Sequence, residues 1–396
     1  MSDHLIAELS GRLKLLAKDL SFLARPRYPL QQLNSLFPQH KSFIQELEDI
    51  HVPFSIDLKQ KHLEIDQLFN DLTHADLTHD IKSIFIKRVE DYKILTEMME
   101  NFHSAQFYDL CTKLYGSSLK IGHHIQFQEF LGKIPHFCVE DIAENKLSGD
   151  LALKYLKDGL INTFGDIGLE VKPSHSLLSD SSAGRKTLKL NPNKSYSTQQ
   201  LDIFLVHEGW VHLGTSLNGA FQTRHPWLAS WAPRTTYLQE GLAILTELIT
   251  QTMTKQRWDK VLLRHLATSM AEKGSGASDI YAFLRHQNLD ELDAFKLTLR
   301  IFRGVPLDGG MAFTKELLYL HGMVKLLNHL NLNSGDLKNL WVGKIGFEEH
   351  DLLMANDQIH SLSLPFFPKK LLDPEVKARL IQLQSLADYY LKDFDL

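Results

Sequence analysis

Apolar residues recur every three or four positions along much of the first 165 residues. This spacing places them on one face of a helix, as in amphipathic helices. At the N-terminus it holds for Leu5, Leu9, Leu13, Leu16, Leu20 and Leu23. From Lys59 to Phe102 it covers a span that suits one long helix or a broken pair. Prolines in "LARPRYPLQQL" and "DIHVPFSIDL" mark loops, because proline removes a donor and clashes with the preceding helical turn.

The pattern changes near Gly168, where two short segments alternate between apolar and polar residues. In "RKTLKLN" the side chains of Leu188 and Leu190 share one face, and turn-forming residues flank the segment in "DSSAG" and "NPN". This segment and "LEVKPSH" are therefore predicted strands. We expect a mainly α chain with a small β-sheet (α+β), divided into a helical N-terminal region, 1–165, and a second region, 166–396.

Two helices of the second region are predicted from their own start signals. In "YSTQQLDIFLVHEGWVHLG", Ser197 and Gln200 are spaced as a capping box, and Gly214 is a predicted stop. This helix is apolar nearly all round, so we expect it to be buried. In "RTTYLQEGLAILTELIT", Thr236 and Gln239 form a second predicted capping box.

Composition excludes several classes of protein. The chain has 396 residues, 43% apolar and 23% charged, which is ordinary for a globular protein large enough for two lobes. Its net charge of −5 and its lack of a long basic run argue against a nucleic-acid partner. No apolar run reaches the roughly 18 residues of a membrane span. Cys111 and Cys138 have no metal or disulfide spacing, so we expect buried thiols and a cytoplasmic protein.

The stretch "HEGWVH" separates His207 from His212 by five positions, one more than in the familiar H-E-x-x-H zinc signature. Residues five apart in a regular helix lie about 140° apart around its axis, which points the two imidazoles away from each other. A π-bulge would bring them back onto one face, and Gly209 would lower the strain of that distortion. Two histidines in an apolar helix also occur as core residues, so the spacing alone leaves both interpretations open.

Nearby carboxylates favour a metal site over a pair of core histidines. Glu208 is a costly charge on an apolar helix unless it has a partner. The next helix offers Glu240 and, seven residues later on the same face, Glu247. Two histidines and a glutamate are the three protein ligands of an open zinc site. A closed, structural site would need a fourth protein ligand, for which His225 in "QTRHPW" is a candidate, or else it is a loop histidine beside a proline.

"HEGWVH" followed by "LQEGLA" resembles the QEGLA-motif family, known as flavohemoglobin expression-modulating QEGLA proteins. Its vertebrate members are the microtubule-associated tyrosine carboxypeptidases. Further segments are similar to the family in the same order: "LNGAFQ", "RGVPLDGGMAFTKELLYLHG" and "VGKIGFEEHDL". The N-terminal half adds "VPFSIDL" and "FYDLCTKLYGSS", so the likeness covers most of the chain.

The resemblance implies a zincin-like metallopeptidase with a bulged H-E-x-x-x-H helix and one Zn²⁺ per chain. His207, His212 and Glu240 would bind the zinc, and Glu208 would be the general base that takes a proton from zinc-activated water. Glu247 falls outside the motif, so we expect it to have a structural role or to support one of the ligands. The chain departs from the family pattern in the order of Gly209 and Trp210. It also departs at Glu316 in "FTKE", where an aspartate is expected.

A carboxypeptidase also needs a cation for the terminal carboxylate of its substrate. Arg303 and Lys315 are the main candidates, Arg300 is a weaker one, and Tyr319 is a candidate donor to the developing oxyanion. The strand "KTLKL" would pair with an extended peptide, or else is an ordinary edge strand.

The metal-site residues favour a zinc-dependent peptidase. The resemblance implies a carboxypeptidase that removes a C-terminal residue, such as tyrosine or another aromatic residue, from an extended peptide or protein tail. One alternative is a non-catalytic protein that binds a partner and has a structural or degenerate metal site. Another is hydrolysis of a non-peptide amide or ester at the same metal.

Overall fold

The structure, a computed structural model, describes residues 2–20, 56–120, 125–175, 177, 179–333, 337–355 and 362–391. The predicted loop at 23–33 and most of that at 49–58 lie outside these residues. Contacts divide the chain into two compact units that interleave along the sequence. Unit 1 contains Met1–Lys14, His124–Lys260 and Tyr319–Leu396, and unit 2 contains Leu15–His123 and Val261–Leu318. The predicted boundary at residue 165 lies within unit 1. The assignment of residues 166–396 as a catalytic region stays a prediction.

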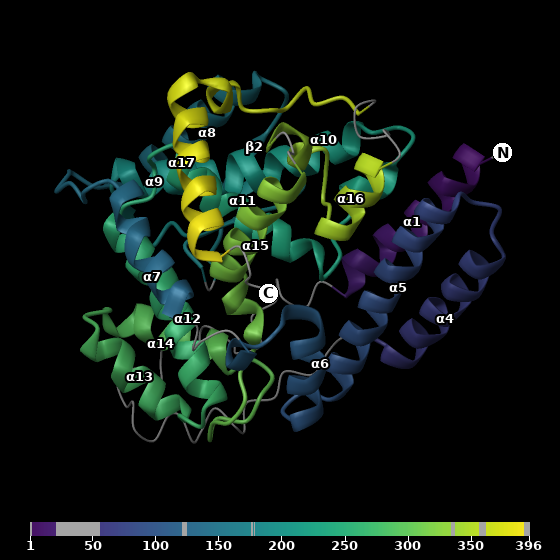
Figure 1. Cartoon of the computed structure of the whole chain (residues 1–396), viewed down its shortest axis with the longest axis horizontal. Helices are drawn as coiled ribbons and strands as arrows, with labels where there is room; N and C mark the ends of the chain where they lie inside the picture. Colours follow the sequence, from purple (N-terminus) through teal and green to yellow (C-terminus); the bar gives the residue numbers. More distant parts are fainter. Residues whose placement is uncertain are drawn as a thin grey trace. The chain divides into compact units, whose positions relative to one another are not determined.

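Unit 2 is helical in the residues that the structure describes. The span from Lys59 to Phe102 forms a broken pair, α4 and α5, which lie side by side (Figure 1). The helices assigned to this unit are α4 (Leu58–His74), α5 (His79–Glu100), α6 (Ala105–Tyr115), α13 (Ala277–His286) and α14 (Glu291–Ile301). Asp57 and Ser104 accept hydrogen bonds from the first turns of α4 and α6, which explains where these two helices begin.

Unit 1 combines helices with two small sheets. Its helices are α7 (Ile125–Lys133), α8 (Gly149–Phe164), α9 (Thr198–Phe204), a π-helix (Leu205–Leu213), α10 (Gly214–Phe221), α11 (Thr235–Ile249), α16 (Phe347–Ala355) and α17 (Pro374–Leu391). Three further helices contain residues of both units: α1 (Ser2–Asp19), α12 (Lys255–Glu272) and α15 (Leu318–Asn333). None of the described helices has the length and apolarity to cross a bilayer.

The two predicted strands are adjacent in a three-stranded sheet. The strands of unit 1 are β1 (Leu147–Ser148), β2 (Glu170–Pro173), β3 (Ser181–Ala183), β4 (Thr187–Leu190) and β5 (Ser195–Tyr196). In the three-stranded sheet β4 is the middle strand and β2 an outer one. β4 pairs in parallel with β2 and antiparallel with β3, while β1 and β5 form a separate antiparallel pair. The α+β prediction is confirmed. Both expectations for "KTLKL", a strand that pairs with an extended peptide or an ordinary edge strand, are wrong, because β4 has a neighbouring strand on each side.

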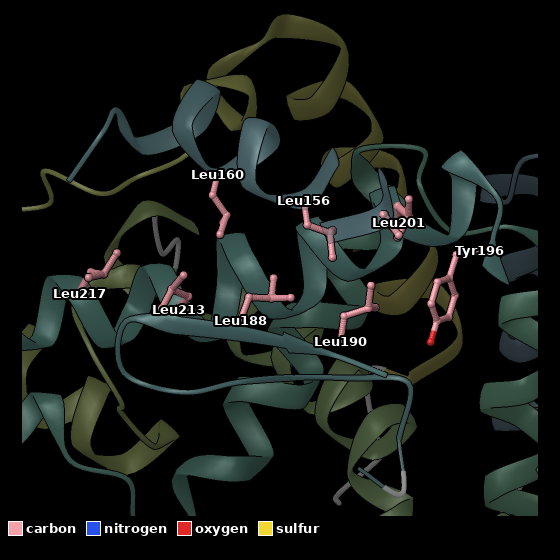
Figure 2. Packing of buried hydrophobic residues seen from close by; sticks show 9 residues of the cluster. Leu156, Leu160, Leu188, Leu190, Tyr196, Leu201, Leu213 and Leu217 are labelled. Atoms are coloured by element: carbon pink, nitrogen blue, oxygen red, sulfur yellow. The ribbon is translucent and has the colours of Figure 1, made fainter. Parts of the chain in front are cut away.

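The sheet and α8 enclose one apolar cluster of unit 1 (Figure 2). Leu188 and Leu190 of β4 are buried on the same face of the strand, as the alternating pattern predicts. They pack with Leu156 and Leu160 of α8. Leu213, at the end of the π-helix, belongs to the same cluster. The core therefore fixes the π-helix against α8 and the sheet.

Candidate metal centre

The π-helix follows α9 without a break in the backbone. The predicted capping box is confirmed: Ser197 accepts from the backbone of Gln200, whose side chain accepts from the backbone of Ser197. The predicted stop at Gly214 is wrong, because the helix continues there as α10. Gly214 instead allows close packing, since a Cβ at this position would lie 3.2 Å from a ring carbon of Phe164.

The π-helix accounts for the extra residue between the histidines. Its i→i+5 hydrogen bonds bring residues five apart onto one face. The imidazole rings of His207 and His212 accordingly lie 4.9 Å apart, edge to face. Gly209 allows the π-helix to pack closely against α8, because a Cβ there would lie only 2.8 Å from a methyl group of Leu160. Trp210 is buried and donates its indole hydrogen to Thr163 of α8.

The helix with the third predicted ligand, α11, begins at Thr235. The predicted capping box at Thr236 is wrong, because Thr236 already lies inside the helix and no side chain caps its start. Gly241 permits a close approach to α15: a Cβ there would come within 2.2 Å of the backbone of Gly322. This contact explains why the helix requires glycine directly after Glu240.

The structure brings His207, His212 and Glu240 together. One ligand atom from each of the three lies within 4.8 Å of the others. Oε2 of Glu240 is 3.4 Å from Nε2 of His207 and 3.8 Å from Nε2 of His212. Glu240 and His207 are buried and His212 is nearly so, which strengthens their electrostatic interaction. His225 does not belong to this group of ligand atoms.

Glu247 orients the first histidine from behind. It is fully buried, and its Oε1 accepts a hydrogen bond from Nδ1 of His207 at 2.6 Å. Arg257 donates to both carboxylate oxygens, at 3.0 and 3.1 Å. Burial alone would raise the pKa of Glu247, but the Arg257 charge and the His207 hydrogen bond lower it to about 2. Glu247 is thus an ionised carboxylate that leaves Nε2 of His207 facing Glu240.

The pKa values of His207 and His212 shift in opposite directions. Burial lowers the pKa of His207, but hydrogen bonds to Glu240 and Glu247 outweigh it and raise the pKa to about 10. Burial lowers the pKa of His212. The carboxylates around His207 therefore favour positive charge at this position. A metal ion that bound there would displace a proton, because ligation requires neutral imidazole.

Glu208 and Tyr319 flank the three residues. Glu208 is partly buried, and its Oε1 accepts a hydrogen bond from Ser181 of β3 at 3.3 Å. The ring of Tyr319, near the start of α15, stacks on that of His207 with centroids 6.1 Å apart. Both residues therefore lie beside the cluster, as predicted for a general base and an oxyanion donor, although the roles themselves stay predictions.

Lys344 connects the π-helix with α11. It is not among the site residues predicted from the sequence. Its ammonium group donates to the backbone carbonyl of His212 at 2.8 Å and to Oε1 of Gln239 at 2.7 Å. Gln239 also accepts from Thr215 of α10 at 2.9 Å. Burial lowers the pKa of Lys344 to about 7, although the charges of Glu240 and Glu208 raise it. Its position in "VGKIGFEEHDL", one of the family-like segments, was the available signal.

The predicted cations for a substrate carboxylate belong to unit 2. Arg303 is buried and lies over the ring of Phe313, 5.9 Å from its centroid. Lys315 lies in a short 3₁₀ helix, Thr314–Leu317, beside Glu316. Glu316 is buried and accepts two hydrogen bonds from Arg300, at 3.0 and 2.8 Å, which gives Arg300 a structural role. Carboxylate binding by Arg303 and Lys315 stays a prediction.

Replacing Glu247 with alanine is expected to reduce stability and metal affinity together. Removing one partner of a buried ion pair costs about 3 to 5 kcal/mol, because Arg257 keeps an uncompensated charge. Loss of a carboxylate that orients a ligating histidine weakens metal binding by about 10- to 100-fold. Denaturant unfolding and zinc competition with a chromophoric chelator measure the two effects.

Glu272 supplies the matched control for this prediction. It is a buried carboxylate of unit 2 that accepts hydrogen bonds from Tyr108, Ser117 and Ser118. Glu272→Ala should lower stability and leave zinc affinity unchanged. Equal zinc affinity in wild type and a folded Glu247→Ala protein would show that Glu247 does not support a metal ligand.

Comparison with protein families identifies a match to most of the chain. The family model of the microtubule-associated tyrosine carboxypeptidases matches residues 38–386. Among curated proteins, no sequence matches the chain significantly.

Proposed function

The chain belongs to the microtubule-associated tyrosine carboxypeptidase family, and from this premise we propose that it is a zincin-like zinc carboxypeptidase. The substrate is the extended C-terminal tail of a protein, and the reaction releases one terminal residue, preferentially tyrosine. The family is one of peptidases, which supports hydrolysis of a peptide bond. The observation that supports a metal site is the convergence of His207, His212 and Glu240 from two helices.

The three residues fit a catalytic zinc site by their chemistry. Two imidazole nitrogens and one carboxylate oxygen are a known ligand set for catalytic zinc, which keeps one position for water or substrate. The second nitrogen of His207 is held by a carboxylate, as is usual for histidines that bind zinc. When bound, zinc supplies a Lewis acid that polarises the scissile carbonyl and lowers the pKa of water.

The protein's own groups then move the proton. Glu208 takes a proton from the attacking water and delivers it to the amine nitrogen of the departing residue. Ser181 donates a hydrogen bond to Glu208 and so limits the orientations of its carboxylate. The hydroxyl group of Tyr319 donates to the carbonyl oxygen as negative charge develops on it.

β3 is the strand on which an extended tail pairs in this proposal. It carries Ser181, which contacts Glu208, and in the described part of the chain its strand pairing is with β4 alone. Its other edge therefore offers backbone groups next to the general base. Pairing there would present the tail's peptide groups in a fixed register.

Peptides that differ in their last residue test the proposal. We expect release of a single C-terminal residue, fastest from a peptide that ends in tyrosine, as measured by mass spectrometry of both products. The matched control is the same peptide with a C-terminal amide, which should resist cleavage because the free carboxylate is absent. Cleavage inside the peptide, or equal cleavage of acid and amide, would contradict a carboxypeptidase. Hydrolysis of simple esters alone would support the non-peptide alternative.

A further inference from the structure

A second group of metal-ligating side chains lies in unit 1, apart from the first. His329 belongs to α15, and His350 and Asp351 are neighbours on α16. One ligand atom from each lies within 4.8 Å of the others. Tyr319, which stacks on His207, precedes His329 by ten residues on α15, or about 15 Å along a helix axis. The second group is thus a separate site.

The distances within this group suit a common ion. Nε2 of His329 is 2.9 Å from Nδ1 of His350. Oδ1 of Asp351 is 3.7 Å from the first nitrogen and 4.0 Å from the second. Two ligand atoms at about 2.0 to 2.1 Å from one zinc ion lie roughly 3 Å apart, so a small movement of the carboxylate completes the set.

The surroundings of this group include a solvent-facing carboxylate and a nearby lysine. Both histidines are buried, while more than half of the Asp351 side chain is exposed, so the group opens to solvent on the carboxylate side. Lys325 opposes a cation, but its ammonium group lies over the rings of Tyr237 and Phe347, 5.5 Å from each centroid.

We propose that His329, His350 and Asp351 form a second metal site, which holds a divalent transition-metal ion such as zinc and ties α15 to α16. Two nitrogens and one oxygen suit zinc and its neighbours better than calcium or magnesium. The alternative is a simple hydrogen bond between the two imidazoles, with Asp351 serving only as a surface charge.

The site would stabilise the segment that carries Lys344. α16 begins at Phe347, three residues after Lys344, which contacts His212 and Gln239. A metal ion that fixes α16 to α15 would therefore restrict this segment. Its expected role is structural, since His329 lies about 15 Å along α15 from Tyr319.

Zinc and cobalt(II) binding to the Glu240→Ala protein tests the second site alone, because this variant lacks a ligand of the first. We expect one bound ion per chain, an absorption band of histidine-ligated cobalt(II), and a melting temperature raised by zinc. Adding His350→Ala should remove all three effects. Adding His286→Ala, which removes an exposed histidine from α13, should change none of them.

If the His350→Ala protein does not fold, Asp351→Asn tests the same metal site through its third ligand. Asp351 is exposed, so its replacement should leave the fold intact and weaken zinc binding by about 10- to 100-fold. Unchanged zinc affinity in Glu240→Ala/Asp351→Asn, or no bound ion in Glu240→Ala, would overturn the proposal. Metal lost with His350→Ala but kept with Glu240→Ala would instead count against the first site.

Discussion

Replacing Glu208 with glutamine is expected to reduce turnover of a tyrosine-ended peptide by about 10²- to 10⁴-fold. Glutamine has the same shape and still accepts a hydrogen bond from Ser181, so the local structure should persist. It does not accept a proton from water at neutral pH, and general-base catalysis is therefore lost. The metal content should equal that of wild type, because Glu208 is not one of the proposed ligands. Steady-state release of tyrosine, measured with metal content on the same sample, checks both statements.

The matched control for Glu208 is an exposed glutamate of unit 1. Glu170 on β2 forms a surface ion pair with Lys172, and Glu170→Gln should leave turnover unchanged. A Glu208→Gln protein as active as wild type on any peptide would rule out the proposed base. Loss of activity together with loss of metal would instead show that Glu208 acts by supporting the metal site.

Replacing Glu240 with glutamine is expected to abolish binding of the catalytic metal and, with it, peptidase activity. The carboxylate lies between the two imidazole nitrogens, 3.4 and 3.8 Å away, and it is the only protein oxygen in this group of ligand atoms. Two histidines do not complete the three-ligand set of a catalytic zinc site. We expect zinc affinity at this site to fall by more than about 100-fold, beyond the effect of losing an orienting group.

Gln239, the preceding residue, provides the comparison for Glu240. It is also buried on α11, and it accepts hydrogen bonds from Lys344 and Thr215 without belonging to the ligand group. Gln239→Ala should lower stability and leave one zinc ion bound at the catalytic site. Full zinc affinity in Glu240→Gln would contradict the assignment of Glu240 as a ligand.

Features with local causes could be predicted from the sequence. The capping box at Ser197, the burial of Leu188 and Leu190, and the distortion that reconciles His207 with His212 each follow from residues close in the chain. The meeting of α11 with the π-helix was inferred from the motif pair "HEGWVH" and "LQEGLA", whose residues the structure brings together.

Features that depend on distant residues could not be predicted in this way. β3 is only three residues long and shows no alternating pattern, so its place between β4 and Glu208 depends on the tertiary fold. Likewise, Arg257 and Lys344 look like ordinary surface charges until the fold brings them to Glu247 and to the His212 carbonyl. Gly214 looks like a helix stop because its packing against Phe164 is not visible locally.

Metal content per chain, measured by elemental mass spectrometry on tag-free protein, decides whether His207, His212 and Glu240 bind zinc. The comparison is between wild type, Glu240→Ala and His212→Ala, each purified without chelator and shown to be folded. We expect each variant to contain one zinc ion fewer than wild type, whether or not the second site is also filled. The same zinc content in all three proteins, or no zinc in wild type after metal is added, would contradict this expectation. His207, His212 and Glu240 would then be a buried polar network of a protein that acts by binding a partner.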